Sequence, residues 1–311
     1  MKHPTTLREK GHVEVGHSRQ SAPIKLYYEM HGSGPEHVLL VMGLSTPCSA
    51  WDHQTKYLAE SGDYTVIVFD NRGMGFSGKS CCHVTRYWTS QMAVDALELL
   101  DHFQWKSNVH LVGISMGGMI SLEMADAEPT RFQSLTLTST TARRNLPTWT
   151  AISTLSKIAL FYRDPKDQLN AAIELVYPSK WLEQKPLVQT EYETNRELAI
   201  HGFIGHIRRS RRQPLHGNLG QTAACLRHYV SDERLINIKS SGLPIMIVTG
   251  TFDNLVRPEY SYHMKKILQD AARFELFEGS GHAIPEEQPD RYNSLLVDHF
   301  STSSSNKRAK L

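Results

Sequence analysis

Gly113-Ile114-Ser115-Met116-Gly117 is the stretch that decides the fold of this 311-residue chain. The apolar run of residues 109–112 precedes it, and a helix-like segment over residues 119–126 follows it. A serine between two glycines at a strand-to-helix junction is typical of a nucleophile elbow, a strained turn that lifts the serine oxygen above the sheet edge. Gly113 and Gly117 suit such a turn because strand and helix pass close together there.

Two further residues complete a candidate catalytic set. Asp253 follows the β-branched run of residues 245–248, and His282 follows a strand-like run over residues 273–277. The chain order Ser, Asp, His is the one expected for this elbow. Open α/β sheets place their chemistry at the carboxyl ends of strands, so we expect Ser115 as nucleophile, His282 as base and Asp253 as acid to meet there.

Each of these residues also has a structural interpretation that the sequence leaves open. Ser115 could form an ordinary turn, and His282 could be a surface loop histidine. Asp253 could be the N-cap of a helix that starts near Pro258.

With these three residues in this order, the chain resembles the α/β-hydrolase superfamily over almost its whole length. Residues 70–77 match a D-x-R-G-x-G-x-S loop, residues 38–44 a third strand with its oxyanion turn, residues 250–258 the acid-bearing loop, and residues 286–289 the opening of the last helix. The resemblance implies an α/β-hydrolase fold: a mostly parallel central sheet flanked by helices, with a helical cap inserted after the sixth strand.

The resemblance also implies an oxyanion hole. Its two backbone N–H donors would be Met116, directly after the nucleophile, and Leu44. The chain departs from the family here, because Met42-Gly43 stands where the family has His-Gly. The side-chain contact of that histidine is therefore missing, whereas the backbone donor at Leu44 should be kept.

Apolar patterning gives the domain organisation. Alternating strands and amphipathic helices predict an α/β core over residues 1–141 and 239–300. Residues 142–238 show helical spacing without a convincing strand, and the resemblance implies that they form the cap. A flexible tail is expected over residues 301–311. The expected strands cover residues 25–28, 38–42, 65–69, 109–112, 134–138, 245–248 and 273–277, and a helix with Ser90 as its cap covers residues 90–103. Several apolar cap residues are candidates to line a cavity: Ile152, Leu155, Ile158, Leu160, Phe161 and Tyr162.

Composition excludes several classes of protein. A net charge of +2 with 21% charged residues does not indicate a nucleic-acid binder. The 16 histidines and four cysteines lack metal-ligand spacing, so we expect neither a metal site nor a cofactor. No run of residues is long and apolar enough for a membrane span. The polar segment over residues 1–12 has no apolar h-region, so we do not expect a secretory signal. The basic cluster Arg208–Arg212 could hold phosphate or carboxylate groups, or be a solvated face.

The last three residues, Ala309-Lys310-Leu311, resemble the S-K-L peroxisomal address. We therefore expect a peroxisomal protein that a peroxisomal import receptor binds through this tripeptide; the alternative is a cytoplasmic protein whose tail ends this way by chance.

Together these features predict a serine hydrolase, similar to carboxylesterases, lipases and thioesterases, that cleaves a small-molecule carboxylic ester or thioester through an acyl-enzyme. Two alternatives stay open: an acyltransferase that uses the same Ser-His-Asp triad, and a non-hydrolytic ligand-binding or cofactor-free member of the superfamily. A similarity to fungal peroxisomal members implies a place in a peroxisomal acyl pathway or in a specialised-metabolite (toxin) pathway.

Overall fold

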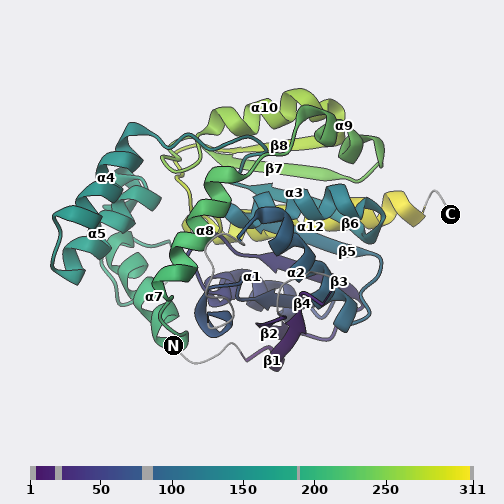
Figure 1. Ribbon diagram of the computed structural model, residues 1–311, viewed down its shortest axis with the longest axis horizontal. Helices are drawn as coiled ribbons and strands as arrows, with labels where there is room; N and C mark the ends of the chain where they lie inside the picture. Colours follow the sequence, from purple (N-terminus) through teal and green to yellow (C-terminus); the bar gives the residue numbers. More distant parts are fainter. Residues whose placement is uncertain (1–4, 18–22, 79–86, 188–189, 309–311) are drawn as a thin grey trace.

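The fold is built on one central sheet, as seen in a computed structural model that describes residues 5–17, 23–78, 87–187 and 190–308 (Figure 1). Its eight strands lie in the order β1-β2-β4-β3-β5-β6-β7-β8. Strands from β3 to β8 pair in parallel, while β2 pairs antiparallel with β1 and β4. The strands are β1 (Leu7–Val15), β2 (Ile24–His31), β3 (Glu36–Val41), β4 (Tyr64–Phe69), β5 (Val109–Ile114), β6 (Phe132–Thr138), β7 (Ile245–Gly250) and β8 (Ala272–Phe277). This confirms the predicted mostly parallel sheet flanked by helices.

Strand β1 is absent from the sequence prediction, which treated the first dozen residues as a polar segment. It pairs with β2 along its length and buries only its end, at Val13 and Val15. A strand at the sheet edge with one solvated face carries many polar residues, so the apolar runs that reveal buried strands are missing from it.

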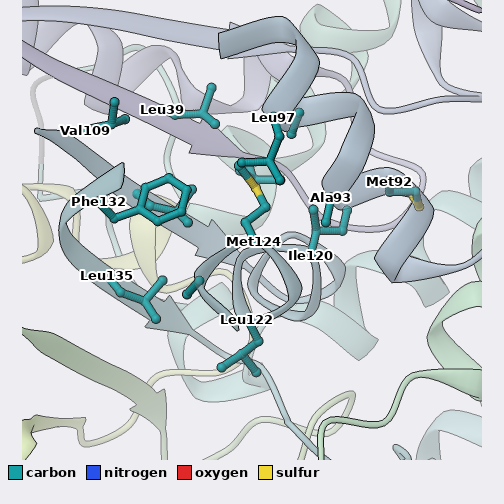
Figure 2. Close-up of a cluster of buried hydrophobic side chains, with 14 of the residues drawn as sticks. Leu39, Met92, Ala93, Leu97, Val109, Ile120, Leu122, Met124, Phe132 and Leu135 are labelled. Carbon is teal, nitrogen blue, oxygen red and sulfur yellow. The ribbon is translucent and has the colours of Figure 1, made fainter. Parts of the chain in front are cut away.

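Helices cover both faces of the sheet. On one face lie α2 (Thr89–His102), α3 (Met116–Ala127), α9 (Asp232–Ser240) and α10 (Pro258–Leu268), and on the other α1 (Asp52–Glu60) and α12 (Pro289–Arg308). Figure 2 shows how α2 and α3 pack on the sheet, with Met124 between Leu97 and the strand residues Leu39 and Phe132. Helix α2 begins one residue before the predicted cap, and Trp88 rather than Ser90 precedes it.

The helical insertion between β6 and β7 contains α4 (Trp149–Leu160), α5 (Pro165–Val176), α6 (Ser179–Leu182), α7 (Asn195–Arg209) and α8 (Leu215–Arg227). Helices α4 to α7 pack on one another beside the core, and α8 reaches back over it (Figure 1). The expected cap boundary at residue 238 falls inside α9, which instead packs on α3 and α10 of the core. Sequence periodicity could not place this boundary, because a cap helix and a core helix share the same apolar spacing.

The end of the chain corrects a second boundary. The expected flexible tail starts at residue 301, whereas α12 continues to Arg308. Ser303 is buried, and its carbonyl oxygen accepts a hydrogen bond of 3.0 Å from Gln133 Nε2. The targeting tripeptide Ala309–Leu311 lies outside the described residues.

Within the described ranges, no helix has the length and apolarity that a membrane crossing requires.

Candidate active site

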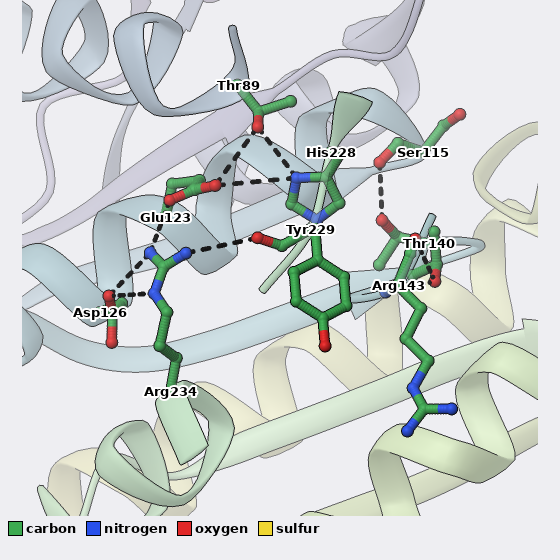
Figure 3. Close-up of polar contacts among 10 residues, drawn as sticks. Thr89, Ser115, Glu123, Asp126, Thr140, Arg143, His228, Tyr229 and Arg234 are labelled. Carbon is green, nitrogen blue, oxygen red and sulfur yellow. Dashed lines mark hydrogen bonds and ion pairs between the residues drawn. The ribbon is translucent and has the colours of Figure 1, made fainter. Parts of the chain in front are cut away.

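The elbow lies where β5 ends and α3 begins. Ser115 adopts φ 56° and ψ −122°, a backbone conformation that non-glycine residues rarely occupy. The Ser115 N–H donates to the carbonyl oxygen of Thr138 at 2.9 Å. Thr140 Oγ1 donates to the carbonyl oxygen of Ser115 at 2.7 Å (Figure 3). These bonds hold the strained turn and leave the side-chain hydroxyl available.

Two glycines allow the close packing around this turn. A Cβ at Gly117 would lie 2.0 Å from the carbonyl oxygen of Val41, so only glycine lets α3 approach β3 this closely. A Cβ at Gly113 would lie 2.4 Å from the carbonyl oxygen of Gly117. Both elbow glycines are thus fixed by the backbone of neighbouring elements.

The candidate acid and base are in direct contact. Asp253 follows β7, and its Oδ1 accepts hydrogen bonds of 2.9 Å from the N–H groups of Leu255 and Val256. Its Oδ2 accepts a hydrogen bond of 2.8 Å from His282 Nδ1. A neutral His282 with its proton on Nδ1 keeps Nε2 free to accept a proton, which is the tautomer that a general base needs.

Charge at this pair favours the imidazolium form. Burial lowers the pKa of His282, but the attraction of Asp253, its hydrogen bond and the nearby Glu287 outweigh that effect, so the pKa is raised above its ordinary value. Burial also raises the pKa of Glu287 to about 7, although the hydrogen bond that its carboxylate accepts from the Gly281 N–H lowers this pKa. His282 is therefore a stronger base than a free imidazole.

The predicted oxyanion turn lies beside the serine. A Cβ at Gly43 would be 3.2 Å from Ser115 Cβ and 3.7 Å from its Oγ, so the Met42-Gly43-Leu44 backbone runs directly past the hydroxyl. Asn71 Nδ2 donates to the carbonyl oxygen of Met42 at 2.8 Å and fixes the turn. Met116 is the first residue of α3, where backbone N–H groups have no partner inside the helix.

One cavity brings the candidate nucleophile, the candidate base and the oxyanion turn together. Its volume is about 390 Å³, and Ser115, His282 and Leu44 line it. Asp253 is buried behind His282, at the end of the hydrogen bond between them. Most of the remaining lining is apolar and comes from both the core and the cap: Met42, Trp51, Met74, Ile114, Met119, Ile173, Val176, Phe203, Ile207, Leu255 and Val256.

The expected cavity lining from α4 is wrong. None of the six apolar candidates at residues 152–162 lines the cavity, and Leu155, Leu160 and Phe161 expose 51%, 63% and 72% of their surface. Helix α4 packs on α5, and α5 and α7 supply Ile173, Val176, Phe203 and Ile207 to the apolar lining of the cavity. An apolar stripe shows that a helix is amphipathic, but it does not show which neighbour its apolar side meets.

Sequence reasoning missed two contacts that tie the cap to the candidate catalytic loops. Buried Gln221 on α8 accepts a hydrogen bond of 2.9 Å from the Ser45 N–H and so holds the oxyanion turn. The carbonyl oxygen of Val176, at the end of α5, accepts a hydrogen bond of 2.9 Å from the His282 N–H. The sequence held a signal for the first contact, because Gln221 is a polar residue among the buried residues Gly217, Gly220 and Ala224 of α8. The second contact is made by backbone atoms and leaves no signal in the sequence.

The basic cluster divides into separate roles. Arg209 forms an ion pair with Asp52, while Arg211 and Arg212 line the cavity. The guanidinium of Arg211 also lies over the ring of Phe76, 5.4 Å from its centre. In the described ranges, no group of three or more His, Cys, Asp or Glu side chains could hold a metal ion.

A second polar network supports the far side of α3 (Figure 3). Arg234 on α9 donates to Glu123 at 2.6 Å and to Asp126 at 2.7 Å. Burial lowers the pKa of His228 to about 3, so it is neutral when it meets Thr89 at 2.9 Å. These contacts fix the helix that starts at the candidate nucleophile, and they lie outside the cavity lining.

Comparisons with known proteins agree with this architecture. The chain is 28% identical over 272 residues to "Putative carbamate hydrolase RutD" of Azorhizobium caulinodans, with 88% of this chain and 93% of that protein covered. It is 34% identical over 113 residues to "Karrikin insensitive 2 receptor CA" of Petunia hybrida, which covers only 36% of this chain and 41% of the receptor. The structure of a thermophilic esterase from Thermogutta terrifontis superposes with a TM-score of 0.74 at 23% identity, covering 94% of this chain and 99% of the esterase.

A sequence profile of the alpha/beta hydrolase fold family matches residues 36–289. This match spans the elbow, the acid-bearing loop and the loop of His282. The chain therefore belongs to the alpha/beta hydrolase fold family.

Proposed function

We propose that the protein is a serine hydrolase that cleaves a carboxylic ester or thioester through an acyl-enzyme on Ser115. The observation that carries the proposal is the apolar cavity that opens on both Ser115 and His282. Its volume of about 390 Å³ lies within the range of small-molecule sites, and its lining suits an acyl chain. Family membership and hydrolase relatives support hydrolysis as the reaction class.

The proposed reaction follows from the contacts of the three residues. Ser115 Oγ attacks the acyl carbon while His282 Nε2 takes the hydroxyl proton, and the resulting imidazolium is held by Asp253. The N–H groups of Leu44 and Met116 would receive the negative charge on the carbonyl oxygen. When the bond to the leaving group breaks, its oxygen or sulfur takes the proton from His282, and water then cleaves the acyl-enzyme by the same steps.

A second candidate substrate is a carbamate. The relatives named as carbamate hydrolases cover most of this chain, and a carbamate presents the same carbonyl carbon to a serine. Only the identity of the atom beside that carbon differs, so the triad would act unchanged.

Matched substrates distinguish these possibilities. We expect the purified protein to hydrolyse oxygen esters or coenzyme A thioesters of one acyl series, with a larger kcat/KM than for carbamates of the same size. Product analysis with added alcohol, amine or thiol detects acyl transfer. A faster carbamate reaction would replace the ester proposal, acyl transfer that exceeds hydrolysis would identify an acyltransferase, and tight binding with a trapped product would favour the ligand-binding alternative.

We further propose that Ala309-Lys310-Leu311 directs the protein to peroxisomes through an import receptor. In a peroxisome-containing cell, a protein with an N-terminal fluorescent tag should be punctate and should move to the cytosol when these three residues are deleted. Activity should be unchanged, because the described site residues all precede α12. Ala309→Ser, which completes S-K-L, is the matched control and should keep the puncta; a deletion variant that stays punctate would contradict the proposal.

A further inference from the structure

A carboxyl group lies in the wall of the otherwise mainly apolar cavity. Glu286, on the short helix α11 (Ile284–Glu287), lines the cavity together with Tyr177 at the end of α5. The Tyr177 hydroxyl donates a hydrogen bond to Glu286 Oε2. Oε1 has no hydrogen-bond partner within the described ranges of the chain, and it is not among their buried unpaired atoms. One oxygen of this carboxyl is therefore accessible from the cavity.

The surroundings of Glu286 disfavour the charged form of its carboxyl group. Burial raises the pKa of Glu286, the hydrogen bond from Tyr177 and the nearby His53 lower it, and Asp52 raises it. The net effect is a raised pKa, because the carboxylate is poorly solvated. Because Oε1 is open to the cavity, a ligand that donates a hydrogen bond to it would give this poorly solvated carboxyl a second partner.

A hydrogen-bond donor lines the same cavity. Burial, the charge of Arg209 and the nearby His53 lower the pKa of His206 on α7 to about 4, so its ring is neutral at physiological pH. Arg209 Nη2 donates to His206 Nδ1 at 3.2 Å, and a guanidinium can only donate. The ring proton must therefore be on Nε2, which is a donor without a partner in the described ranges.

We propose that Glu286, with His206, recognises a hydroxyl group on the substrate away from the bond that is cleaved. This inference rests on the proposed function and names its substrate class. A hydroxyl suits the chemistry of both residues, because it can donate to Glu286 Oε1 and accept from His206 Nε2. A neutral donor suits the cavity better than an ammonium group, since Arg211 and Arg212 also line it and would repel a cation.

The test compares acyl substrates that end in a hydroxyl group with substrates of equal length that end in a methyl group, over a range of chain lengths. For the best chain length, wild type should favour the hydroxyl substrate by about 10- to 100-fold in kcat/KM, the range expected for one hydrogen bond to a charged group. Glu286→Leu should reduce this ratio to about one, and Glu286→Gln, which keeps an acceptor oxygen and the side-chain shape, should give an intermediate ratio.

The control is Glu278→Gln, the same chemical change at an exposed glutamate outside the cavity lining, and it should keep the wild-type ratio. A ratio near one in wild type, or a ratio that Glu286→Leu leaves unchanged, overturns the inference. A substrate ending in an ammonium group that reacts faster than its hydroxyl counterpart would overturn the assignment to a neutral donor.

A binding measurement separates this inference from the proposed function. If wild type hydrolyses neither member of the pair, the proposed function fails, and calorimetric titration of Ser115→Ala with the two free acids decides the inference alone. Binding of the hydroxy acid that is about 10-fold tighter or more, and that is lost in Ser115→Ala/Glu286→Leu, supports the site. Equal affinity for both acids rejects it.

Discussion

Ser115→Ala should abolish turnover, with a fall in kcat of roughly 10⁶-fold, the loss seen when a catalytic serine is removed from a complete triad. The substitution removes the attacking atom, and the remaining oxyanion hole can only bind a substrate that nothing attacks. The fold should be retained, because the hydrogen bonds of this residue to Thr138 and Thr140 are made by its backbone. Single-turnover and steady-state kinetics give the rate, and thermal unfolding shows whether the variant is folded.

Comparing single and double variants of Ser115 and His282 tests their assignment as nucleophile and base more strictly than one variant does. His282→Ala should cost about as much as Ser115→Ala, and the double variant should lose little more, because the two side chains act in one step. Ser294→Ala, at an exposed serine of α12, is the matched control and should keep full activity. A folded Ser115→Ala protein that still turns over at a rate near wild type would place the nucleophile elsewhere.

The parts of the fold that the sequence predicts are those with a strong local signal. Parallel strands buried on both faces appear as largely apolar runs, as in residues 109–112 and 245–248. A glycine turn and then a polar residue follow each run, with Ser115 after the first and Asp253 after the second. The fixed chain order of Ser115, Asp253 and His282 then identified candidates that the fold brings to one edge of the sheet.

The parts that the sequence could not predict depend on contacts between distant segments. Strand β1 is polar because only its end is buried, and α9 belongs to the core because of what it packs against. Helix α4 shows the same limit, since its exposed apolar side matches the pattern of a helix that lines a cavity.

The contact between Glu286 and Tyr177 also depends on segments that are distant in the sequence. Glu286 lies only four positions after His282, but its partner Tyr177 comes from the cap. Glu286 and Tyr177 do not form a recognisable sequence motif, because the inserted helices bring them together and not their spacing along the chain. Substrate recognition in this fold therefore has to be read from three-dimensional contacts, whereas the triad can be read from order and spacing.

Asp253→Asn should cost up to about 10⁴ in kcat, because an amide in this position stabilises the wrong imidazole tautomer. The side-chain oxygen of asparagine can still accept from the N–H groups of Leu255 and Val256, which leaves its amide to donate towards His282 Nδ1. The imidazole proton then moves to Nε2, and the base can no longer accept the proton of Ser115.

The same variant should change the pH profile in a defined direction. His282 must be neutral to act as base, so wild-type kcat/KM should rise with pH through a pKa above the ordinary value of 6.5. Burial alone lowers this pKa and Asp253 raises it, so in Asp253→Asn the remaining activity should have its acid limb at lower pH. Stability should depend on pH in the opposite direction to activity. The Asp253–His282 pair contributes fully to the free energy of unfolding of wild type below pH 6.5, and this contribution is lost as pH rises through the folded-state pKa of His282.

Asp270→Asn, the same change at an exposed aspartate, should alter neither the rate nor the acid limb. If Asp253→Asn instead keeps a rate near wild type, another carboxylate orients His282. Glu287 is the described candidate, because it is buried beside His282 and its charge already raises the pKa of that ring. Glu287→Gln distinguishes the two assignments. If Asp253 is the acid, this substitution should shift the acid limb to lower pH with only a small loss of kcat. If Glu287 is the acid, Glu287→Gln should cause the large loss of kcat.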